Sequence, residues 1–517
     1  MSEARVKPVR QSSNELNLSW RDQRYVKFYE VVDDLVDELQ EHVWLELGKP
    51  RRRLNGNGLK KLHYSVECLL RNCLAVVLQR QRKGDASIQK GQHHYGSSRS
   101  DKLLTYSIHI ERAFNGLIEL GYLEVTKGGY FDRVGRKDGS ATSRLSRYVA
   151  TEKLLHKFTD EEINAIPALI PSYKDPETIR VRVKETDENG VGRRRTLAVT
   201  ETPEVLRMCT NLEVINHALS KHWYDLQIPD QELSELQRRL AADHENERTI
   251  RMDNRNLYRV FNDTELKTGG RFYGGWWQNI PREYRKQMVV NGKPMVELDY
   301  SNQHPSILYA WAGIMRPKDC YSDVIKFKKF PEGTTQRDLR DMVKAAFNAM
   351  LNSPKMLKQA PKGVRPSRFK LKWSDVSEAI MAYHKSIAHH FYTGIGLKLQ
   401  RVDSDIAEKV MIHFAKDGIA VLPLHDSFLM HSGYATWLEP VMRNVFQEVV
   451  GVPPTIDHKS SDNKPAGERQ RTDDDIGLPV TLDIKEIMER SQGHNYRLSA
   501  FQSLQYLRPK NVSLPSF

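Results

Sequence analysis

The stretch VELDYSNQHPSILYAWAG (residues 296–313) constrains the fold more than any other, because it places Asp299 in an apolar, strand-prone run. Asp299 stands at the end of the predicted strand, and a polar turn follows it. A second stretch, IAVLPLHDSFLMHSG (residues 419–433), repeats this design with His425 and Asp426. A buried carboxylate is costly unless it is paired or binds a metal. Two such acids in separate apolar strands therefore predict a shared cation site.

Composition limits the kind of protein that surrounds these strands. The chain has 517 residues, enough for two to four domains, and its formal net charge of +13 favours an acidic polymer as partner. A basic protein that is merely soluble is the alternative. The cysteines show neither CxxC spacing nor nearby histidines, which argues against a disulfide framework or a zinc site. They are Cys68, Cys73, Cys209 and Cys320.

Neither a signal sequence nor a membrane span is predicted. The first twenty residues lack the apolar core of a signal peptide. Nowhere do eighteen apolar residues follow one another. We therefore expect a soluble, cytoplasmic protein that has no membrane partner.

The first part of the chain combines helices with a basic hairpin. Residues 20–48 carry apolar side chains at helical spacing, namely Phe28, Val31, Val32, Leu35 and Leu39. A second apolar helix follows, and residues 79–102 are polar and basic without a period, which predicts a loop. A further helical face comprises Ile110, Ala113, Phe114, Leu117 and Leu120, and Gly121 ends it. Two short strands, YLEVTKG and SRYVAT, then enclose a glycine-rich turn.

Helix, strand, basic wing and strand resemble a winged helix-turn-helix, a fold often used on duplex DNA. A module that only contacts other proteins is the alternative. Basic residues near the wing favour nucleic acid, because they pair with phosphates. They are Arg133, Arg136, Lys137, Arg144 and Arg147.

Five stretches in the second half carry polar residues that suit chemistry. In chain order they are TGGRFYGGWWQNIP (268–281), the Asp299 strand and turn, RDLRDMVKAAFNAMLN (337–352), LQRVDSDIAEKVM (399–411) and LPLHDSF (422–428). Each is weak alone. A helical Arg-x-x-x-Lys pair such as Arg340 and Lys344 is usually a solvated face, and a lone strand Asp is usually ion-paired.

Together, the five resemble the palm and fingers of A-family DNA polymerases, the bacterial DNA polymerase I type, and the related phage-type single-subunit RNA polymerases. The matched positions are Thr268, Arg271, Gln278 to Pro281, Asp299-Tyr300-Ser301, Arg340, Lys344, Gln400, Asp405, Ile406, Met411 and His425-Asp426-Ser427. The resemblance covers about residues 265–450. It implies an α+β, mostly helical fold: a right-hand palm built on an antiparallel sheet, with helical fingers and thumb.

The resemblance also implies a chemistry. Nucleotidyl transfer depends on charge neutralisation and positioning, commonly by two Mg²⁺ ions, for which Mn²⁺ can substitute. Asp299 and Asp426 would bridge both ions, with a backbone carbonyl near Tyr300 completing the shell. Arg340 and Lys344 would meet the triphosphate. By resemblance, Arg271, Gln278, Gln400 and His425 would contact primer or template. The implied partners are DNA, as primer-template and as duplex, and dNTPs.

The chain departs from the A-family pattern at several positions. Asn348 and Asn352 stand where the family carries a Phe and a Tyr that stack on and gate the nucleotide, and Phe347 comes one position early. Stacking must then be arranged elsewhere, through Tyr383 or Tyr392. His304 aligns with the Glu of the family's sugar gate, and its bulk favours deoxynucleotides. The last motif, His-Asp-Ser, is nearer to the RNA polymerase branch.

We expect five segments: a helical arm (1–59), a winged-helix domain (60–156), a mostly helical linker or thumb-like region (157–260), palm and fingers (261–455) and a flexible tail (456–517). Residues 1–260 show no run of paired acids typical of a proofreading exonuclease. The favoured function is a DNA polymerase in replication of a mobile element or phage. Two alternatives stay open: a primase or RNA polymerase using RNA or rNTPs, and a non-catalytic replication initiator.

Overall fold

The computed structural model describes residues 26–45, 54, 56–77, 86–88, 108–127, 131–132, 142–143, 146–159, 178–186, 192–242, 250, 252, 254–326, 329–458, 493–495, 497–499 and 501–502. Within these residues the fold is α+β, as expected, and its sheets are largely antiparallel. The chain forms two compact units. The first comprises residues 1–172, 225–253 and 481–517, and the second comprises residues 173–224 and 254–480.

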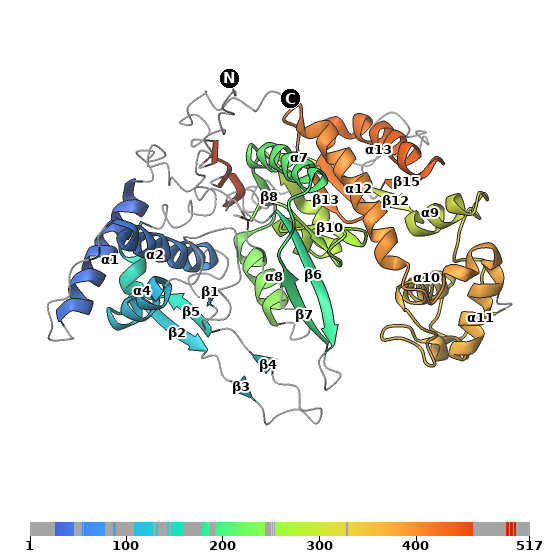
Figure 1. Cartoon of the computed structure of the whole chain (residues 1–517), viewed down its shortest axis with the longest axis horizontal. Coiled ribbons are helices and arrows are strands. Elements are labelled where there is room, and N and C mark those ends of the chain that lie inside the picture. Colours follow the sequence, from blue (N-terminus) through green and yellow to red (C-terminus); the bar gives the residue numbers. More distant parts are fainter. Residues whose placement is uncertain are drawn as a thin grey trace, which may run out of the picture. The chain divides into compact units, whose positions relative to one another are not determined.

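The first unit has one helical core beside a small sheet (Figure 1). Its helices are α1 (Val26–Leu45), α2 (Gly56–Val77), α4 (Ile108–Glu119), α5 (Glu152–Leu155) and α8 (Asp230–Ala242). The sheet has the order β1-β5-β2, with β1 (Ala86–Ile88), β2 (Leu123–Lys127) and β5 (Ser146–Ala150), all antiparallel. A separate short pair joins β3 (Phe131–Asp132) to β4 (Thr142–Ser143).

The predicted helical faces are confirmed in this core. The five apolar residues expected on the first helix are buried on α1, and Ala113, Phe114 and Leu117 of α4 are buried with them. Gly121, with a φ of +75°, follows the end of α4, because a left-handed residue there stops the helix. The expected boundary at residue 59 is wrong, because it falls inside α2 and α1 packs into the same core as α2 and α4.

For this unit, the loop expected at residues 79–102 is corrected, and the expected winged helix-turn-helix stays a prediction. The loop predicted for residues 79–102 contains β1, because Ala86–Ile88 pairs with the edge of β5. The helix and flanking strands predicted around the wing are present. The winged helix-turn-helix itself stays a prediction, since its basic residues Arg133, Arg136, Lys137 and Arg144 lie outside the described residues.

The tail predicted for residues 456–517 is not wholly a tail. Arg497 is buried, and its guanidinium pairs with the buried carboxylate of Asp225 at 2.8 Å and with Asp230 at 3.0 Å. Burial would raise the pKa of Asp225, but Arg497 and His494 hold it well below its usual range. Phe501 is also buried. A charge pair far apart in sequence therefore anchors this segment in the first unit.

The second unit contains two sheets. One has the order β10-β9-β6-β7, formed by β6 (Ile179–Thr186), β7 (Gly192–Leu197), β9 (Tyr258–Phe261) and β10 (Gly269–Tyr273). Its β6·β9 pair is parallel and the others are antiparallel. Residues 157–260 therefore contain strands as well as the helices expected there. The run IRVRVKET alternates apolar and basic residues, which is the period of a half-buried strand.

The other sheet has the order β13-β14-β12-β11-β8, with β15 paired to β12. Its strands in the second unit are β11 (Met288–Val290), β12 (Lys293–Ser301), β13 (Val421–Leu424), β14 (Ser427–His431) and β15 (Thr455–His458). The division between the units falls within β8 (Tyr224–Leu226), after Tyr224. The pairs of β12 with β11, β14 and β15 are antiparallel, as is β13·β14. Since β15 belongs to this sheet, the boundary expected at residue 455 cuts through a strand.

The helices of this unit lie partly beside these sheets and partly apart from them, on the right of the view (Figure 1). They are α7 (Pro203–Ser220), α9 (Gln303–Trp311), α10 (Gln336–Asn352), α11 (Trp373–Tyr383), α12 (Gly396–Ala415) and α13 (Ala435–Val450), with short 3₁₀ turns at Trp276–Asn279, Arg282–Gln287, Pro366–Phe369, Lys385–His390 and Ser432–Tyr434. α12 packs against β10, β13 and α7, and α13 packs against β12 and β14. None of the helices in the described ranges is both long and apolar enough to cross a bilayer.

Candidate active site

The pairing of β12 with β14 brings the two predicted aspartates together. Asp299 lies opposite Ser427 in the ladder, so Asp426 comes one step further, beside Tyr300. The backbone N–H of Tyr300 donates to the backbone carbonyl of Asp426 at 3.1 Å. Asp299 is half-buried and Asp426 is exposed. Two acids from distant segments therefore meet at one end of the sheet, beside solvent.

His425 and Asp426 form a two-residue turn between β13 and β14. His425 has a φ of +65°, in the left-handed region that residues with a Cβ rarely adopt. Two-residue hairpin turns of this kind usually carry Gly, Asn or Asp. A histidine in a strained turn is typical of a functional site. Desolvation by the surrounding protein, and then the positive charge of Arg271, lower the pKa of His425.

Tyr300 points away from this edge. Its hydroxyl donates to the backbone carbonyl of Met442 at 2.7 Å, and its ring packs against Phe428 and Phe446. Successive strand residues face opposite sides of a sheet, so Asp299 lies on the other side. Only the backbone of Tyr300 can therefore serve a ligand on the side of Asp299.

A buried acid, Glu297, occupies the next position on the face of Asp299. The hydroxyl of Ser427 donates to Glu297 Oε1 at 3.0 Å, and Arg285 pairs with the same oxygen at 3.1 Å. Ser427, the last residue of the His-Asp-Ser motif, thus hydrogen-bonds an acid from the neighbouring strand. Within the described ranges, no three His, Cys, Asp or Glu side chains gather closely enough to hold a metal. The two predicted acids are therefore adjacent through the backbone of their paired strands.

His304 lies in the first turn of α9 and is held by a residue that the sequence did not single out. Asn302, with a φ of +54°, turns the chain from β12 into α9. His304 Nε2 then lies 2.8 Å from Oδ2 of Asp403, on α12. Arg271, on β10, donates to the same oxygen at 2.7 Å. Burial would raise the pKa of Asp403, but His304 and Arg271 hold it below its usual range.

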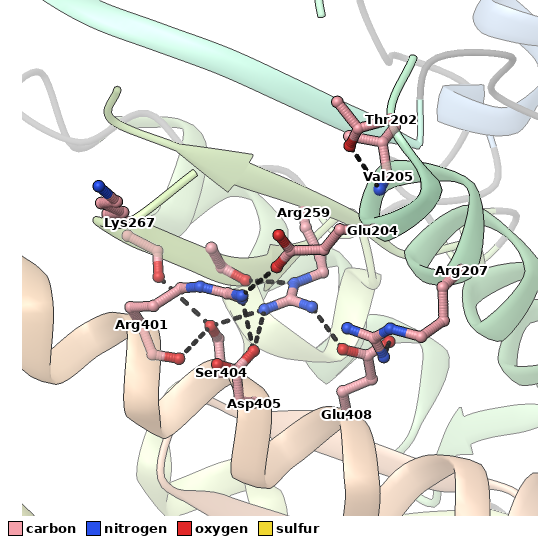
Figure 2. Close-up of polar contacts among 12 residues, drawn as sticks. Thr202, Glu204, Val205, Arg207, Arg259, Lys267, Arg401, Ser404, Asp405 and Glu408 are labelled. Atoms are coloured by element: carbon pink, nitrogen blue, oxygen red, sulfur yellow. Dashed lines mark hydrogen bonds and ion pairs between the residues drawn. The ribbon is translucent and has the colours of Figure 1, made fainter. Parts of the chain in front are cut away.

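The opposite face of α12 holds Arg259, which is wholly buried. Arg259 donates to Glu408 at 2.6 Å, to Ser404 at 2.8 Å and to Asp405 at 3.0 Å (Figure 2). Asp405 also pairs with Arg401. Asp405, one of the positions that carry the resemblance, therefore has a structural role. Gln400 lies three residues before Asp403 and shares its face, where it is half-buried.

The glycine-rich segment lets β10 approach α12 closely. Gly270 has a φ of +80°, and a Cβ there would lie 2.8 Å from Ser404 Oγ and 2.7 Å from the Phe261 ring. The carbonyl of Gly270 accepts from Arg259 Nε at 2.8 Å. Only glycine fits this position. The close approach sets Arg271 beside Asp403.

The side-chain amide nitrogen of Gln278 is hydrogen-bonded within the protein. Its Nε2 donates to the carbonyl of Phe272 at 2.9 Å and lies 3.3 Å from that of Pro423. Trp277 donates to the same Pro423 carbonyl at 3.2 Å. The segment before the first acid is therefore fixed to β13, and Gln278 keeps only its side-chain oxygen for the predicted nucleic-acid contact.

On α10 the predicted phosphate-binding pair differs in its surroundings. Arg340 Nε donates to Asp319 at 2.8 Å, and Asp319 also accepts from the backbone of Tyr321 and Ser322. Lys344 is exposed, and it has no acidic partner among the described residues. Lys344 is therefore the freer of the two cations.

The residues at and near the family's stacking positions, and the tyrosines expected to replace them, differ in burial. Phe347 is buried among the rings of Tyr321, His384 and Phe391, so it cannot stack on a ligand. Asn348 is half-buried, and its carbonyl accepts from Asn352 at 2.7 Å. Tyr383 and Tyr392 are both half-buried in the same unit. The aromatic cluster around Phe347 therefore forms the core of this helical part.

No protein-family model matches the chain, and no curated protein matches it. Among solved structures, the chain is similar to the POL domain of Pol1 from M. smegmatis in complex with DNA primer-template and dNTP. The two are 16% identical with a TM-score of 0.28, over 44% of this chain and 50% of that one. The match thus spans about half of that structure.

Proposed function

We propose that this chain is a template-directed nucleotidyltransferase, a DNA polymerase that extends a primer with dNTPs. The observation that carries the proposal is the meeting of Asp299 and Asp426, where the backbone of Tyr300 bonds that of Asp426 at 3.1 Å. A strained turn at His425 holds the exposed acid there. The two acids lie where the paired strands β12 and β14 meet the turn, near Arg271 and His304. In a chain of net charge +13, such an arrangement fits a phosphate-bearing substrate.

The donor set fits Mg²⁺, with Mn²⁺ as a substitute. Carboxylate and backbone oxygens are hard ligands, and Mg²⁺ commonly binds through one or two carboxylates while waters and substrate phosphates fill its remaining positions. Asp299 and Asp426 would hold the metal, with the backbone of Tyr300 as a further oxygen source. When bound, two such ions would neutralise charge at the reacting phosphate.

The protein's own side chains would position the substrate. Lys344, exposed and without an acidic partner in the described ranges, suits a point contact with a triphosphate. Arg340 would hold the loop of Asp319 in place through Nε and offer its terminal N–H groups. Arg271 and Gln400 would contact primer or template, and His304 would face the sugar.

Ribonucleotide polymerisation, as a primase or RNA polymerase, is the second candidate. The order His425-Asp426-Ser427 favours it by resemblance, and the same two acids would serve. A non-catalytic replication initiator is a third, in which this sheet edge binds but does not react.

The decisive experiment measures incorporation on primed and unprimed templates with dNTPs or rNTPs in Mg²⁺. We expect primer extension by the wild type and none by Asp299→Ala or Asp426→Ala, with DNA binding retained by both. Asp417→Ala, at an exposed aspartate after α12, is the matched control and should remain active. Extension by either site variant at the wild-type rate would overturn the metal assignment. An inactive wild type that binds DNA would favour the initiator.

A further inference from the structure

Asp403 combines full burial with two cationic or polar partners from different elements. Its side chain is 1% exposed, and its Oδ2 accepts from Arg271 on β10 and lies 2.8 Å from His304 Nε2 on α9. Its Oδ1 is buried and has no hydrogen-bond partner among the described residues, and the same holds for Arg271 Nε. One carboxylate oxygen therefore serves both neighbours while a buried donor and a buried acceptor stay unmatched.

This geometry is unusual for a pair that serves only stability. Arginine and carboxylate commonly pair through two parallel hydrogen bonds, which would satisfy Asp403 Oδ1 and Arg271 Nε together. Leaving buried polar atoms unsatisfied costs free energy. Arg259, on the other face of α12, instead satisfies all three of its nitrogens on Gly270, Glu408, Ser404 and Asp405. Asp403 is thus placed to hold His304, and it forgoes a second hydrogen bond with Arg271.

We propose that Asp403 is a positioning residue that fixes the His304 ring against the nucleotide sugar and so sets the selectivity between dNTPs and rNTPs. This inference rests on the proposed function. His304 comes five residues after Asp299, in the first turn of α9, which follows β12. With Nε2 held by Asp403, only Nδ1 of the ring is left for another polar contact. A ring fixed in this way either excludes a 2′-hydroxyl by its bulk or hydrogen-bonds it.

The test compares Asp403→Asn with a matched control on the same helix. Asn keeps the size of Asp but removes its charge, and a hydrogen bond to a charged group is strong enough that selectivity should change about tenfold or more. Glu408→Gln is the control, because Glu408 is also buried and ion-paired on α12 but its partner is Arg259. We expect both variants to be less stable and only Asp403→Asn to change the ratio of kcat/KM for dNTP to that for rNTP.

A double-mutant cycle decides whether Asp403 acts through His304. In a His304→Ala background the ring is gone, so Asp403→Asn should change the selectivity ratio by less than about twofold. An equal change in both backgrounds, or no change in either, would overturn the inference. A change caused equally by Glu408→Gln would also overturn it, because loss of stability alone would then explain the effect.

A second readout needs no polymerase activity. The ring signals of His304 in a histidine-labelled protein can be assigned by their loss in His304→Gln. They should shift in Asp403→Asn and stay unchanged in Glu408→Gln. An inactive wild type in which these shifts occur would refute the proposed function but retain the contact. An unmoved His304 signal in Asp403→Asn would refute the positioning role whether or not the protein incorporates nucleotides.

Discussion

The backbone N–H of Tyr300 donates to the backbone carbonyl of Asp426 at 3.1 Å, and this bond ties the end of β12 to the turn that begins β14. Because the bond is between main-chain atoms, it does not depend on the identity of either side chain. It fixes the position of Asp426 beside Asp299, and each side chain can then be changed without separating the strands. Substitution of either acid therefore tests its chemistry rather than the pairing of the strands.

The two cations of α10 should have unequal effects. Lys344→Ala should raise KM for the nucleotide and lower kcat, because a charged contact strengthens as charge develops on the leaving pyrophosphate. Arg340→Ala should do the same and also destabilise the loop around Asp319, whose partner it removes. Steady-state kinetics and thermal unfolding of both variants separate the two effects. Unchanged kinetics in both would make this helix face a solvated surface.

Ser427 should tolerate no acid. Ser427→Ala removes a hydrogen bond to the buried Glu297 and should cost about 1–3 kcal/mol. Ser427→Glu should lower the free energy of unfolding further, because it places a second carboxylate against Glu297, and Glu297 already pairs with Arg285. Urea unfolding of the two variants and the wild type measures the order. A Ser427→Glu variant as stable as wild type would mean that the strands can hold both acids.

The stabilising effect of Asp319 should vanish in acid. Burial would raise its pKa, but Arg340 and the backbone N–H groups of Tyr321 and Ser322 lower it from 3.8 to about 2. The unfolded state therefore binds more protons between these values, and stability is lost as the pH falls from about 4 towards 2. The urea midpoints of wild type and Asp319→Asn should differ at pH 6 and converge at low pH. A constant difference would exclude this ion pair as the cause.

The predicted wing should supply phosphate contacts. Deleting residues 1–155 would cut through the core of the first unit, so charge-neutral substitutions give a cleaner test. Replacing Arg133, Arg136 and Lys137 with Gln should weaken duplex binding and reduce the slope of log K against log salt by up to about 3, since each phosphate contact contributes about 0.9. Incorporation on a saturating primed template should be retained. An identical slope would favour the alternative, a protein-contact module.

Local pattern determined much of this protein. Helical spacing predicted the face of α1 that is buried, and acids in apolar runs indicated Asp299 and Asp426, whose strands are paired. These features follow from the few residues on either side, since side-chain period and the cost of a buried charge are local properties. Strand β6 was also readable from alternation, although a mostly helical region was predicted there.

The tertiary structure alone decided which charges meet. In the sequence, Asp403 is one of several polar residues on a predicted helix. Only the fold brings it into contact with His304 and Arg271, which lie on two other elements. Glu408 with Arg259 and Asp319 with Arg340 are likewise pairs whose members lie on different elements. An ionisable side chain gives the same local signal whether it ends in solvent or opposite a partner, because burial and charge pairing are set by segments far along the chain.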